Sequence, residues 1–293
     1  MRHILGDVMI IDVMNNNDIF LSWRENGEKK IDIKSFRPYF YVDDSHKEIA
    51  SYSVSKYLKR DFEYESGEWF SLEGTKLKKV YVDEYKDMKK ARERFIQTWE
   101  ADVPYHRRYA VDNLTELPEY NMRKWYWDME WQQGGEHDGC ITTIVAYDNY
   151  DKQYYQWVWY PDAPSHLHWK QSDKIAVFNN EKDMIESFMT TMVVKDPDML
   201  IAWFGNFADV PKLLERACAV GLNPLIMSPI GSIKGIRKTK NEGFKFLYYD
   251  NGFSPIEQPI GGRITLNLDM AFERQWNDSQ RGTLPSLSLD YVS

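Results

Sequence analysis

An alternation of apolar and polar side chains marks residues 125–131, WYWDMEW. Successive side chains of a β-strand point to opposite faces, so the three tryptophans and Met129 are expected to share one face. Asp128 and Glu130 share the other face with Tyr126, and the rise of a strand separates the two acids by roughly 7 Å at their Cα atoms. The pattern predicts a strand that buries its tryptophan face under helices and carries two carboxylates on the opposite face.

Short apolar segments separated by turns dominate the first hundred residues. The Ser-His-Lys-Glu sequence that begins at Ser45 is a capping box, which predicts the start of a helix. The elements expected here are a hairpin of strands at 4–13 and 18–24, strands at 39–42 and 76–82, and helices at 45–60 and 84–100. We therefore expect a small α+β domain over residues 1–104, with its boundary at Asp102-Val103-Pro104.

From residue 105 onwards, strand patterns alternate with helix patterns. The segment 181–194 repeats apolar residues on one helical face and predicts an amphipathic helix. The other elements expected are strands between 124 and about 160, a short buried strand at 200–203 and a helix at 209–220. Alternating strands and helices are typical of an α/β sheet with helical cover, so residues 105–293 are expected to form an α/β domain.

Composition and charge place the chain among ordinary globular proteins. Of its 293 residues, 43% are hydrophobic and 28% are charged, and the net charge is −8. Proteins that coat nucleic acid are normally basic, so the charge argues against a simple coating protein. It suits an enzyme with clustered carboxylates, and equally any cytosolic protein. No segment approaches the roughly 18 consecutive apolar residues of a membrane span, so we expect a soluble, cytoplasmic protein without a membrane partner.

Asp128 and Glu130 are candidate metal ligands, because paired carboxylates on one strand face suit a hard divalent cation. Such pairs are also common on surface strands, where they are simply solvated. Asp209, with Pro211 two residues later, fits the first turn of a helix. From the residues alone, Asp209 is either a helix cap or a third acid that faces Asp128 and Glu130.

Several segments resemble, in order and in spacing, those of family B DNA polymerases. Asp128-Met129-Glu130 resembles the first exonuclease motif of that family, and Asp209 with the helix after it resembles the second motif. The other similar segments are FRPYFY at 36–41, DVPY at 102–105, SPIG at 228–231 and LPSLSLDYVS at 284–293. The last two are especially similar to polymerases of large tailed phages. The resemblance covers essentially the whole chain.

The resemblance implies a ribonuclease-H-like exonuclease domain at 105–293, preceded by the N-terminal domain of a polymerase at 1–104. It also implies 3′→5′ proofreading, in which two Mg²⁺ or Mn²⁺ ions support hydrolysis of the terminal phosphodiester bond of single-stranded or mispaired DNA. Asp128, Glu130 and Asp209 would be both the catalytic residues and the metal ligands. The implied partners are DNA, as a single-stranded 3′ end or a primer–template, and the remainder of the polymerase chain.

A basic segment further along the chain is a candidate DNA contact. Lys234, Arg237 and Lys238 lie in a predicted hairpin at 230–250. This region resembles a hairpin that touches DNA in the related polymerases, which implies contact with phosphates. The alternative interpretation is a solvated loop.

The loop before Asp209 departs from the family pattern. The family usually has Asn, three residues and then Phe-Asp, whereas Phe204 and Ala208 occupy those positions here. Asn206 is a candidate substitute for the family's asparagine. With Phe207, it is an expected nucleic-acid contact.

The third exonuclease motif of the family, Tyr-x-x-x-Asp, is expected beyond residue 293, as is the polymerase active site. Residues 147–151 fit the same spacing, but their polar sequence predicts a hairpin turn. The exonuclease site within this chain is therefore expected to be incomplete, and weakly active or inactive. Two alternatives stay open: an inactive nucleic-acid-binding or structural module with the same fold, and a stand-alone ribonuclease-H-like nuclease.

Overall fold

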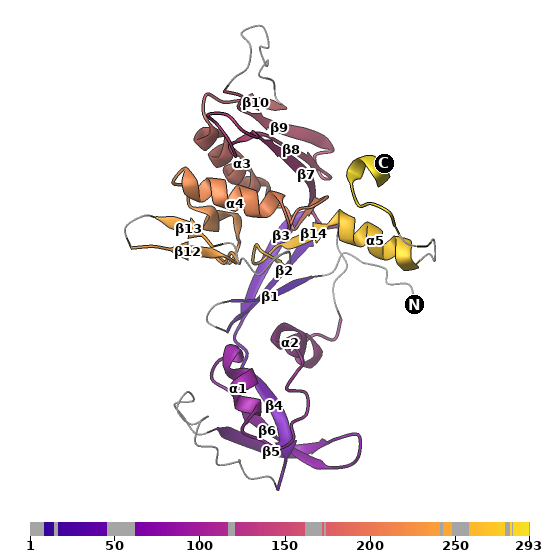
Figure 1. Ribbon diagram of the computed structural model, residues 1–293. Coiled ribbons are helices and arrows are strands. Elements are labelled where there is room, and N and C mark those ends of the chain that lie inside the picture. The colour runs from indigo at the N-terminus through magenta and orange to yellow at the C-terminus, as the bar shows by residue number, and fades with distance from the viewer. Residues whose placement is uncertain are drawn as a thin grey trace. The chain divides into compact units, whose positions relative to one another are not determined.

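A computed structural model of the protein (Figure 1) describes residues 9–14, 17–45, 62–116, 121–161, 172, 174–240, 243–247, 258–278, 282 and 284–292. The helix predicted at 45–60 lies almost entirely outside these residues. Within the described part of the chain, no helix combines the length and the apolar character that crossing a bilayer requires.

The chain divides into two compact units. The C-terminal unit comprises Met1–Ile10, Arg24–Gly27 and Tyr120–Ser293, and the N-terminal unit comprises Ile11–Trp23 and Glu28–Glu119. This division falls later in the chain than Pro104, because the helix that begins at Tyr105 groups with the N-terminal unit. The predicted domains, 1–104 and 105–293, stay a prediction.

A six-stranded sheet is the framework of the C-terminal unit, with the order β10-β9-β8-β7-β11-β14. Its strands are β7 (Lys124–Trp131), β8 (Ile141–Asp148), β9 (Gln153–Val158), β10 (Ile175–Val177), β11 (Met199–Ala202) and β14 (Ile264–Asn267). β7 pairs with β8 in antiparallel register and with β11 in parallel register. The strand predicted at 124–131 therefore exists and lies inside the sheet.

Burial along β7 alternates as the sequence predicts. Trp125 and Trp127 are 0% and 5% exposed and Met129 is 3% exposed, whereas Asp128 and Glu130 are exposed. A strand with this alternation can sit in only one register, because a slip of one residue would expose the tryptophans and bury the acids. The apolar face therefore fixes the direction of the two carboxylates.

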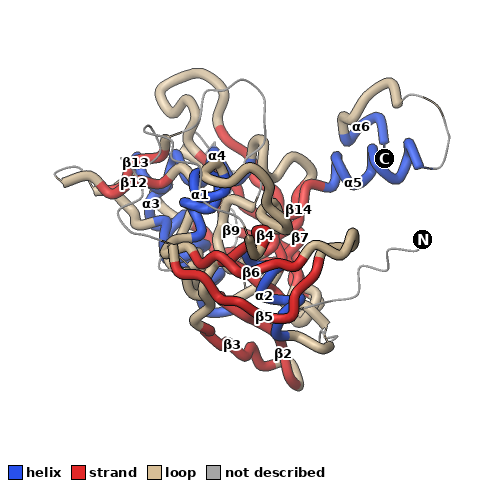
Figure 2. Tube along the Cα trace, turned by 90° about the horizontal axis from the view of Figure 1, so that it is seen from below, coloured by secondary structure: helices blue, strands red, loops and turns tan. Residues whose placement is uncertain are grey.

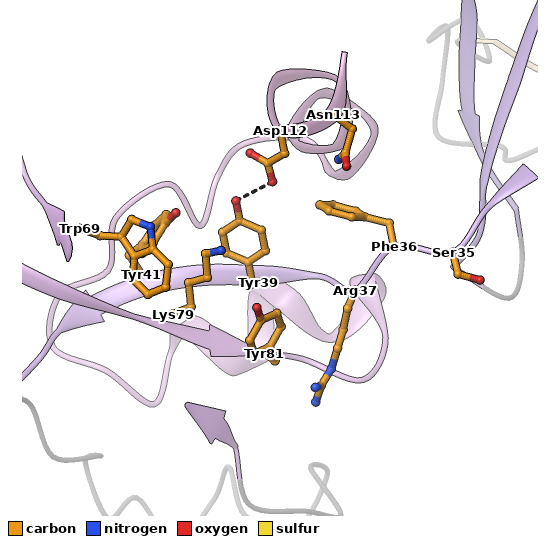
Figure 3. A pocket seen from close by; sticks show the side chains of 10 residues that line it. All are labelled: Ser35, Phe36, Arg37, Tyr39, Tyr41, Trp69, Lys79, Tyr81, Asp112 and Asn113. Carbon is orange, nitrogen blue, oxygen red and sulfur yellow. Dashed lines mark hydrogen bonds between the residues drawn. The ribbon is translucent and has the colours of Figure 1, made fainter. Parts of the chain in front are cut away.

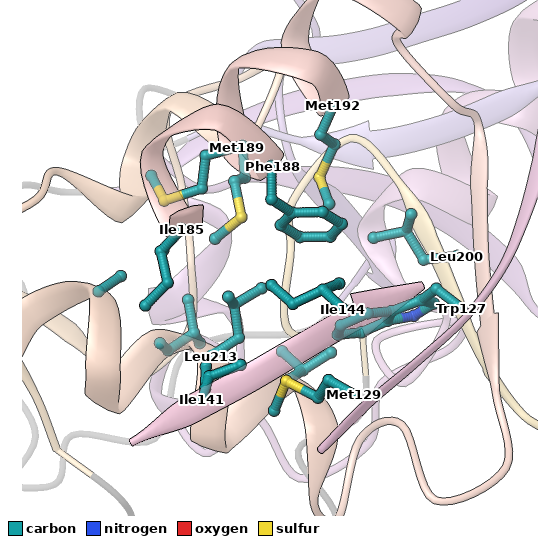
Figure 4. Close-up of a cluster of buried hydrophobic side chains, with 14 of the residues drawn as sticks. Trp127, Met129, Ile141, Ile144, Ile185, Phe188, Met189, Met192, Leu200 and Leu213 are labelled. Atoms are coloured by element: carbon teal, nitrogen blue, oxygen red, sulfur yellow. The ribbon is translucent and has the colours of Figure 1, made fainter. Parts of the chain in front are cut away.

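Two helices cover the apolar face of β7 (Figure 4). They are α3 (Glu181–Lys195) and α4 (Asp209–Ala219), close to the predicted bounds. The Phe188 ring of α3 stacks on Trp127 with ring centroids 5.8 Å apart, and Leu213 of α4 enters the same cluster. Together these side chains form the largest apolar core of the described residues.

A buried ion pair holds α3 and α4 together. Arg216 of α4 donates from Nε and Nη2 to the two carboxylate oxygens of Glu181, at 2.8 and 2.5 Å. The same carboxylate accepts a 2.8 Å hydrogen bond from the Ile141 amide at the start of β8. Because Glu181 is 5% exposed and satisfied by several donors, it fixes α4 against the sheet.

A second buried carboxylate closes the β8–β9 hairpin. Asp148 accepts hydrogen bonds from the Trp125 indole at 2.7 Å and from Arg123 Nε at 2.8 Å. Its other oxygen accepts from the amides of Tyr150 and Asp151. The Tyr-x-x-x-Asp spacing at 147–151 is thus a turn, as predicted.

The rest of the C-terminal unit extends from this sheet. The segments are η2 (Pro224–Met227), β12 (Ile236–Lys238), β13 (Phe244–Phe246), α5 (Leu268–Asp278) and α6 (Leu289–Val292). β12 and β13 pair as an antiparallel hairpin, which confirms the hairpin predicted within 230–250.

Two three-stranded sheets make up most of the N-terminal unit (Figure 2). One has the order β1-β2-β3 and the other the order β4-β6-β5. The strands are β1 (Ile10–Val13), β2 (Ile19–Glu25), β3 (Glu28–Lys34), β4 (Tyr39–Asp43), β5 (Glu63–Phe70) and β6 (Lys76–Tyr81). The strands predicted at 39–42 and 76–82 are confirmed, and so is the N-terminal hairpin over its described residues, whereas residues 4–8 of that hairpin lie outside the described part of the chain.

The helix predicted at 84–100 is much shorter than expected. The chain forms η1 (Tyr85–Asp87) and α1 (Met88–Arg92) and then leaves the helix. Trp99 instead exchanges two backbone hydrogen bonds with Tyr41, at 2.9 and 3.0 Å, which extends the edge of the second sheet. Tertiary pairing therefore overrides the helical propensity of this segment.

The sheet formed by β4, β6 and β5 has two different faces. Phe40, Val42 and Val80 pack with Ala91 and Phe95 in a small apolar core. The opposite face lines an open pocket of about 540 Å³ against α2 (Tyr105–Asn113), as Figure 3 shows.

Interactions within this pocket join the sheet to α2. The Tyr39 hydroxyl donates to Asp112 at 2.6 Å. The Lys79 ammonium lies over both the Tyr39 and the Trp69 rings, at 4.7 and 4.5 Å from their centroids. Cation–π contacts of this kind stabilise a surface cluster without requiring a buried charge.

Replacing Asp148 tests how β7 is anchored. Asp148→Ala would leave the buried Trp125 indole N–H without its acceptor, so we expect the free energy of unfolding to fall by about 3–5 kcal/mol. The control is Asp151→Ala in the same turn, where the side chain is 29% exposed and the expected cost is about 1 kcal/mol. Urea unfolding measures both variants, and equal losses would show that the buried hydrogen bonds do not anchor the strand.

Candidate active site

Asp128 and Glu130 lie near the carboxyl end of β7, beyond the end of the neighbouring parallel strand β11. The register pairs Met199 with Lys124 and Ile201 with Tyr126, and β11 ends one residue later. The two acids therefore lie on the exposed face of the sheet, at the edge where β11 turns towards α4.

Asp209 reaches this edge from the other side of the same turn. It is the first residue of α4 and is only 5% exposed. Burial, the largest cause, and the negative charges of Asp128 and Glu130 together raise the pKa of Asp209 from 3.8 to about 7, although a hydrogen bond to its own backbone lowers it in part. The alternative of a simple helix cap is disfavoured, because Ala208 and not Asp209 occupies the N-cap position and because Asp209 interacts with the charges of both other acids.

The three carboxylates are near enough for their charges to interact, but they do not form a complete metal-binding site. Among the residues that the structure describes, no three His, Cys, Asp or Glu side chains gather closely enough to hold a metal ion. Carboxylate oxygens are nevertheless the ligands that hard divalent cations prefer. A positive charge placed among these acids would also relieve the repulsion that raises the pKa of Asp209.

The loop between β11 and α4 brings different residues to the surface from those the sequence suggested. Asn206, an expected DNA contact, is 7% exposed, and its backbone N–H donates to Asn267 Oδ1 at 2.7 Å. Phe207 is half-buried, whereas Phe204 is 38% exposed. The burial of Asn206 makes it a poor candidate for contacting a strand of DNA.

The basic hairpin lies away from the carboxylates. Lys234, Arg237 and Lys238 are exposed, and β13 packs beside Glu215 and Cys218 in the second half of α4. At the rise of an α-helix, the nine residues from Asp209 to Cys218 span about 13 Å. Any DNA contact made by these basic residues would therefore be separate from the three carboxylates.

Two residues at the site's edge could not be identified from the sequence motifs. Asn267, at the end of β14, accepts the hydrogen bond that fixes the loop. Trp203 follows β11 directly, and its indole N–H donates to the Leu287 carbonyl at 2.8 Å. Neither residue belongs to a sequence motif, because the contacts to Asn206 and Leu287 join segments that are far apart in the sequence.

Asp209→Asn provides a test of the electrostatics in the absence of metal. A carboxyl whose pKa is raised by folding keeps its proton longer in the native state, so native stability falls as the pH rises from about 4 to about 7. Asparagine does not ionise, so it removes the loss of native stability that ionisation of Asp209 causes. We expect Asp209→Asn to exceed the parent protein in unfolding free energy by about 2–4 kcal/mol at pH 8, and by little near pH 4.

Chemical denaturation in EDTA at both pH values measures this difference. Glu186→Gln, on the exposed side of α3, is the matched control and should change stability equally at the two pH values. A pH-independent effect of Asp209→Asn would contradict the raised pKa.

Residues 131–271 match the family model described as DNA polymerase family B, exonuclease domain. A DNA polymerase of Pyrococcus glycovorans is 24% identical over 92% of this chain, and DNA polymerase 1 of Pyrococcus abyssi is 25% identical over the same share. The chain spans about a third of the length of these relatives (33% and 34%). Both are archaeal, and the likeness to phage polymerases stays a prediction.

A solved structure agrees on the fold. The family B DNA polymerase of the archaeon Pyrobaculum calidifontis superposes with a TM-score of 0.56 at 16% identity, covering 97% of this chain and 41% of that one. The α/β, ribonuclease-H-like fold class expected for the larger domain is confirmed. Over residues 131–271, this chain is therefore similar to the exonuclease domain of the family B DNA polymerases.

Proposed function

We propose that this protein removes nucleotides from the 3′ end of single-stranded or mispaired DNA, as the proofreading part of a DNA polymerase. The observation that carries the proposal is the approach of three acids from two elements, near enough for their charges to interact. Asp128 and Glu130 share the exposed face of β7, and the buried Asp209 senses the charge of both. The exonuclease-domain match to residues 131–271 supports nuclease chemistry at this position.

Two divalent cations, Mg²⁺ or Mn²⁺, would be the cofactors, and Asp128, Glu130 and Asp209 would hold them. The bound ions would supply charge stabilisation at the scissile phosphate and an activated water. The protein's own contribution is positioning. α4 holds Asp209 rigidly at its first turn, and the buried face of β7 aims Asp128 and Glu130 into the same space.

The proposed partners are DNA and the remainder of a polymerase chain. The relatives are DNA polymerases, and they align with both units of this chain, which favours this proposal over a stand-alone nuclease. The basic residues Lys234, Arg237 and Lys238 are proposed to contact phosphates away from the site of hydrolysis. We place the reaction in the cytoplasm, where replication proceeds in a microbial or phage-infected cell.

A second candidate function is an inactive nucleic-acid-binding module with the same fold. It is favoured by one observation: in the described part of the chain the acids do not gather into a group that could hold a metal. The replacement of the family's Asn and Phe by Phe204 and Ala208 points the same way.

Hydrolysis of a labelled oligonucleotide separates the two candidates. With a 5′-labelled single strand and Mn²⁺, we expect products that shorten stepwise from the 3′ end. Asp128→Asn or Glu130→Gln should lower the rate by a factor of about 10²–10⁴, because each removes a charged ligand while keeping the shape of the side chain. Asp138→Asn, an exposed acid in the loop after β7, is the control and should leave the rate unchanged.

Binding without hydrolysis by the parent protein would favour the inactive module. Hydrolysis that survives Asp128→Asn would place the reaction elsewhere.

A further inference from the structure

Three tyrosines of adjacent strands, Tyr126, Tyr147 and Tyr154, form a row of aromatic rings beside the carboxylates of β7. We infer that this tyrosine row stacks on unpaired bases of a single DNA strand whose 3′ end reaches Asp128 and Glu130. The inference rests on the proposed exonuclease function and adds to it a surface that holds the strand.

The tyrosine row crosses β7, β8 and β9, which are neighbours in the six-stranded sheet (Figure 1). Tyr126 lies opposite Tyr147, and Tyr147 lies opposite Tyr154. Residues that lie opposite each other in an antiparallel pair point to the same face of the sheet. The ring centroids are accordingly 6.3 Å apart in the first pair and 5.0 Å apart in the second. The three rings therefore form one continuous aromatic surface.

The tyrosine row shares its face of the sheet with the acids of β7. Tyr126 comes two residues before Asp128, so the two side chains point the same way and their Cα atoms are roughly 7 Å apart. Tyr126 is 43% exposed, whereas Trp127 on the other face is buried in the core. On β9, Tyr154 is 57% exposed and Trp157 is buried in the same core. A strand that binds along the row therefore lies next to Asp128.

Other tyrosines of this unit use their hydroxyl groups to hold the fold, whereas the tyrosine row does not. The Tyr155 hydroxyl donates to Asp151 at 2.8 Å, and the Tyr150 hydroxyl donates to the Asn121 carbonyl. Within the described residues, the hydroxyls of the tyrosine row make no hydrogen bond of this kind. Contact between neighbouring rings stabilises the paired strands, but it does not require the rings to stay open to solvent.

Unpaired bases are the ligand that this surface fits. Every nucleobase has a π-face, so adjacent exposed rings can stack on bases without selecting a sequence. Aromatic side chains on the open face of a sheet can hold two or three bases of a single strand in this way. Lys124, two residues before Tyr126 on the same face, adds a positive charge on the side of the row away from Asp128. This charge favours a ligand that carries phosphates as well as bases.

Binding of a 5′-fluorescein-labelled single-stranded oligonucleotide to the full chain tests the tyrosine row. Fluorescence anisotropy in the presence of Ca²⁺ gives Kd over times in which the labelled strand stays intact. Tyr154→Ala removes the most exposed ring, Tyr126→Ala removes the ring beside Asp128, and Tyr154→Phe removes only a hydroxyl. Tyr160→Ala is the matched control, because Tyr160 is also exposed (45%) and lies in the same unit, beyond the opposite end of β9 from Tyr154.

A second oligonucleotide with abasic residues at its 3′ end separates stacking from a structural effect. It keeps the phosphates and lacks the bases that the rings would hold. The parent protein should bind the ordinary strand more tightly than the abasic strand, and Tyr126→Ala and Tyr154→Ala should lose this preference. The melting temperature of each variant shows whether the fold is retained.

We expect Tyr126→Ala and Tyr154→Ala each to raise Kd about 5- to 100-fold, because stacking on one ring contributes that much to binding a single base. Tyr154→Phe and Tyr160→Ala should bind as the parent does. Unchanged Kd in both alanine variants, an equal rise for Tyr160→Ala or an equal loss with the abasic strand would overturn the assignment, as would a parent protein that does not bind the strand. Binding that depends on the tyrosine row, without hydrolysis in Mn²⁺, would support the row and count against the exonuclease proposal alone.

Discussion

Burial of the tryptophan face of β7 is the constraint on which the candidate site depends. Trp125, Trp127 and Met129 lie under α3 and α4, where Phe188 stacks on the Trp127 ring. Burying side chains of this size contributes several kcal/mol of hydrophobic stabilisation, far more than any interaction that two exposed carboxylates could offer. The core therefore determines the register of the strand, and the register determines where the acids point.

The position of Asp209 is a second consequence of the same core. α4 buries Val210, Leu213 and Leu214, and Arg216 ties it to Glu181. With the helix held along its length, its first residue cannot move away from the two acids on β7. The protein therefore maintains an unfavourable arrangement of like charges that a bound cation would relieve. Local instability of this kind at a functional site is offset by the packing around it.

The sequence predicted best those elements whose pattern of apolar and polar residues follows directly from the burial of one face. The alternation at 125–131 and the helical periodicity at 181–194 reflect contact with one core, so their bounds are nearly correct. The helix expected at 84–100 is wrong after Arg92, because pairing of Trp99 with Tyr41 is a long-range contact that local propensity does not contain.

The site was predictable in part for the same reason. The face shared by Asp128 and Glu130 follows from strand geometry alone. The burial of Asn206 and the exposure of Phe204 depend on a hydrogen bond to Asn267, sixty-one residues further along the chain. No pattern within the loop could show that contact.

The pKa of Asp209, followed by NMR with ¹³C-labelled aspartate in metal-free protein, tests the central claim most directly. If the core brings the three acids together, Asp209 should titrate near pH 7, and its pKa should fall when Asp128→Asn removes a neighbouring charge. A value close to the ordinary 3.8 that does not respond to Asp128→Asn would show that β7 and α4 do not place these acids in a common site.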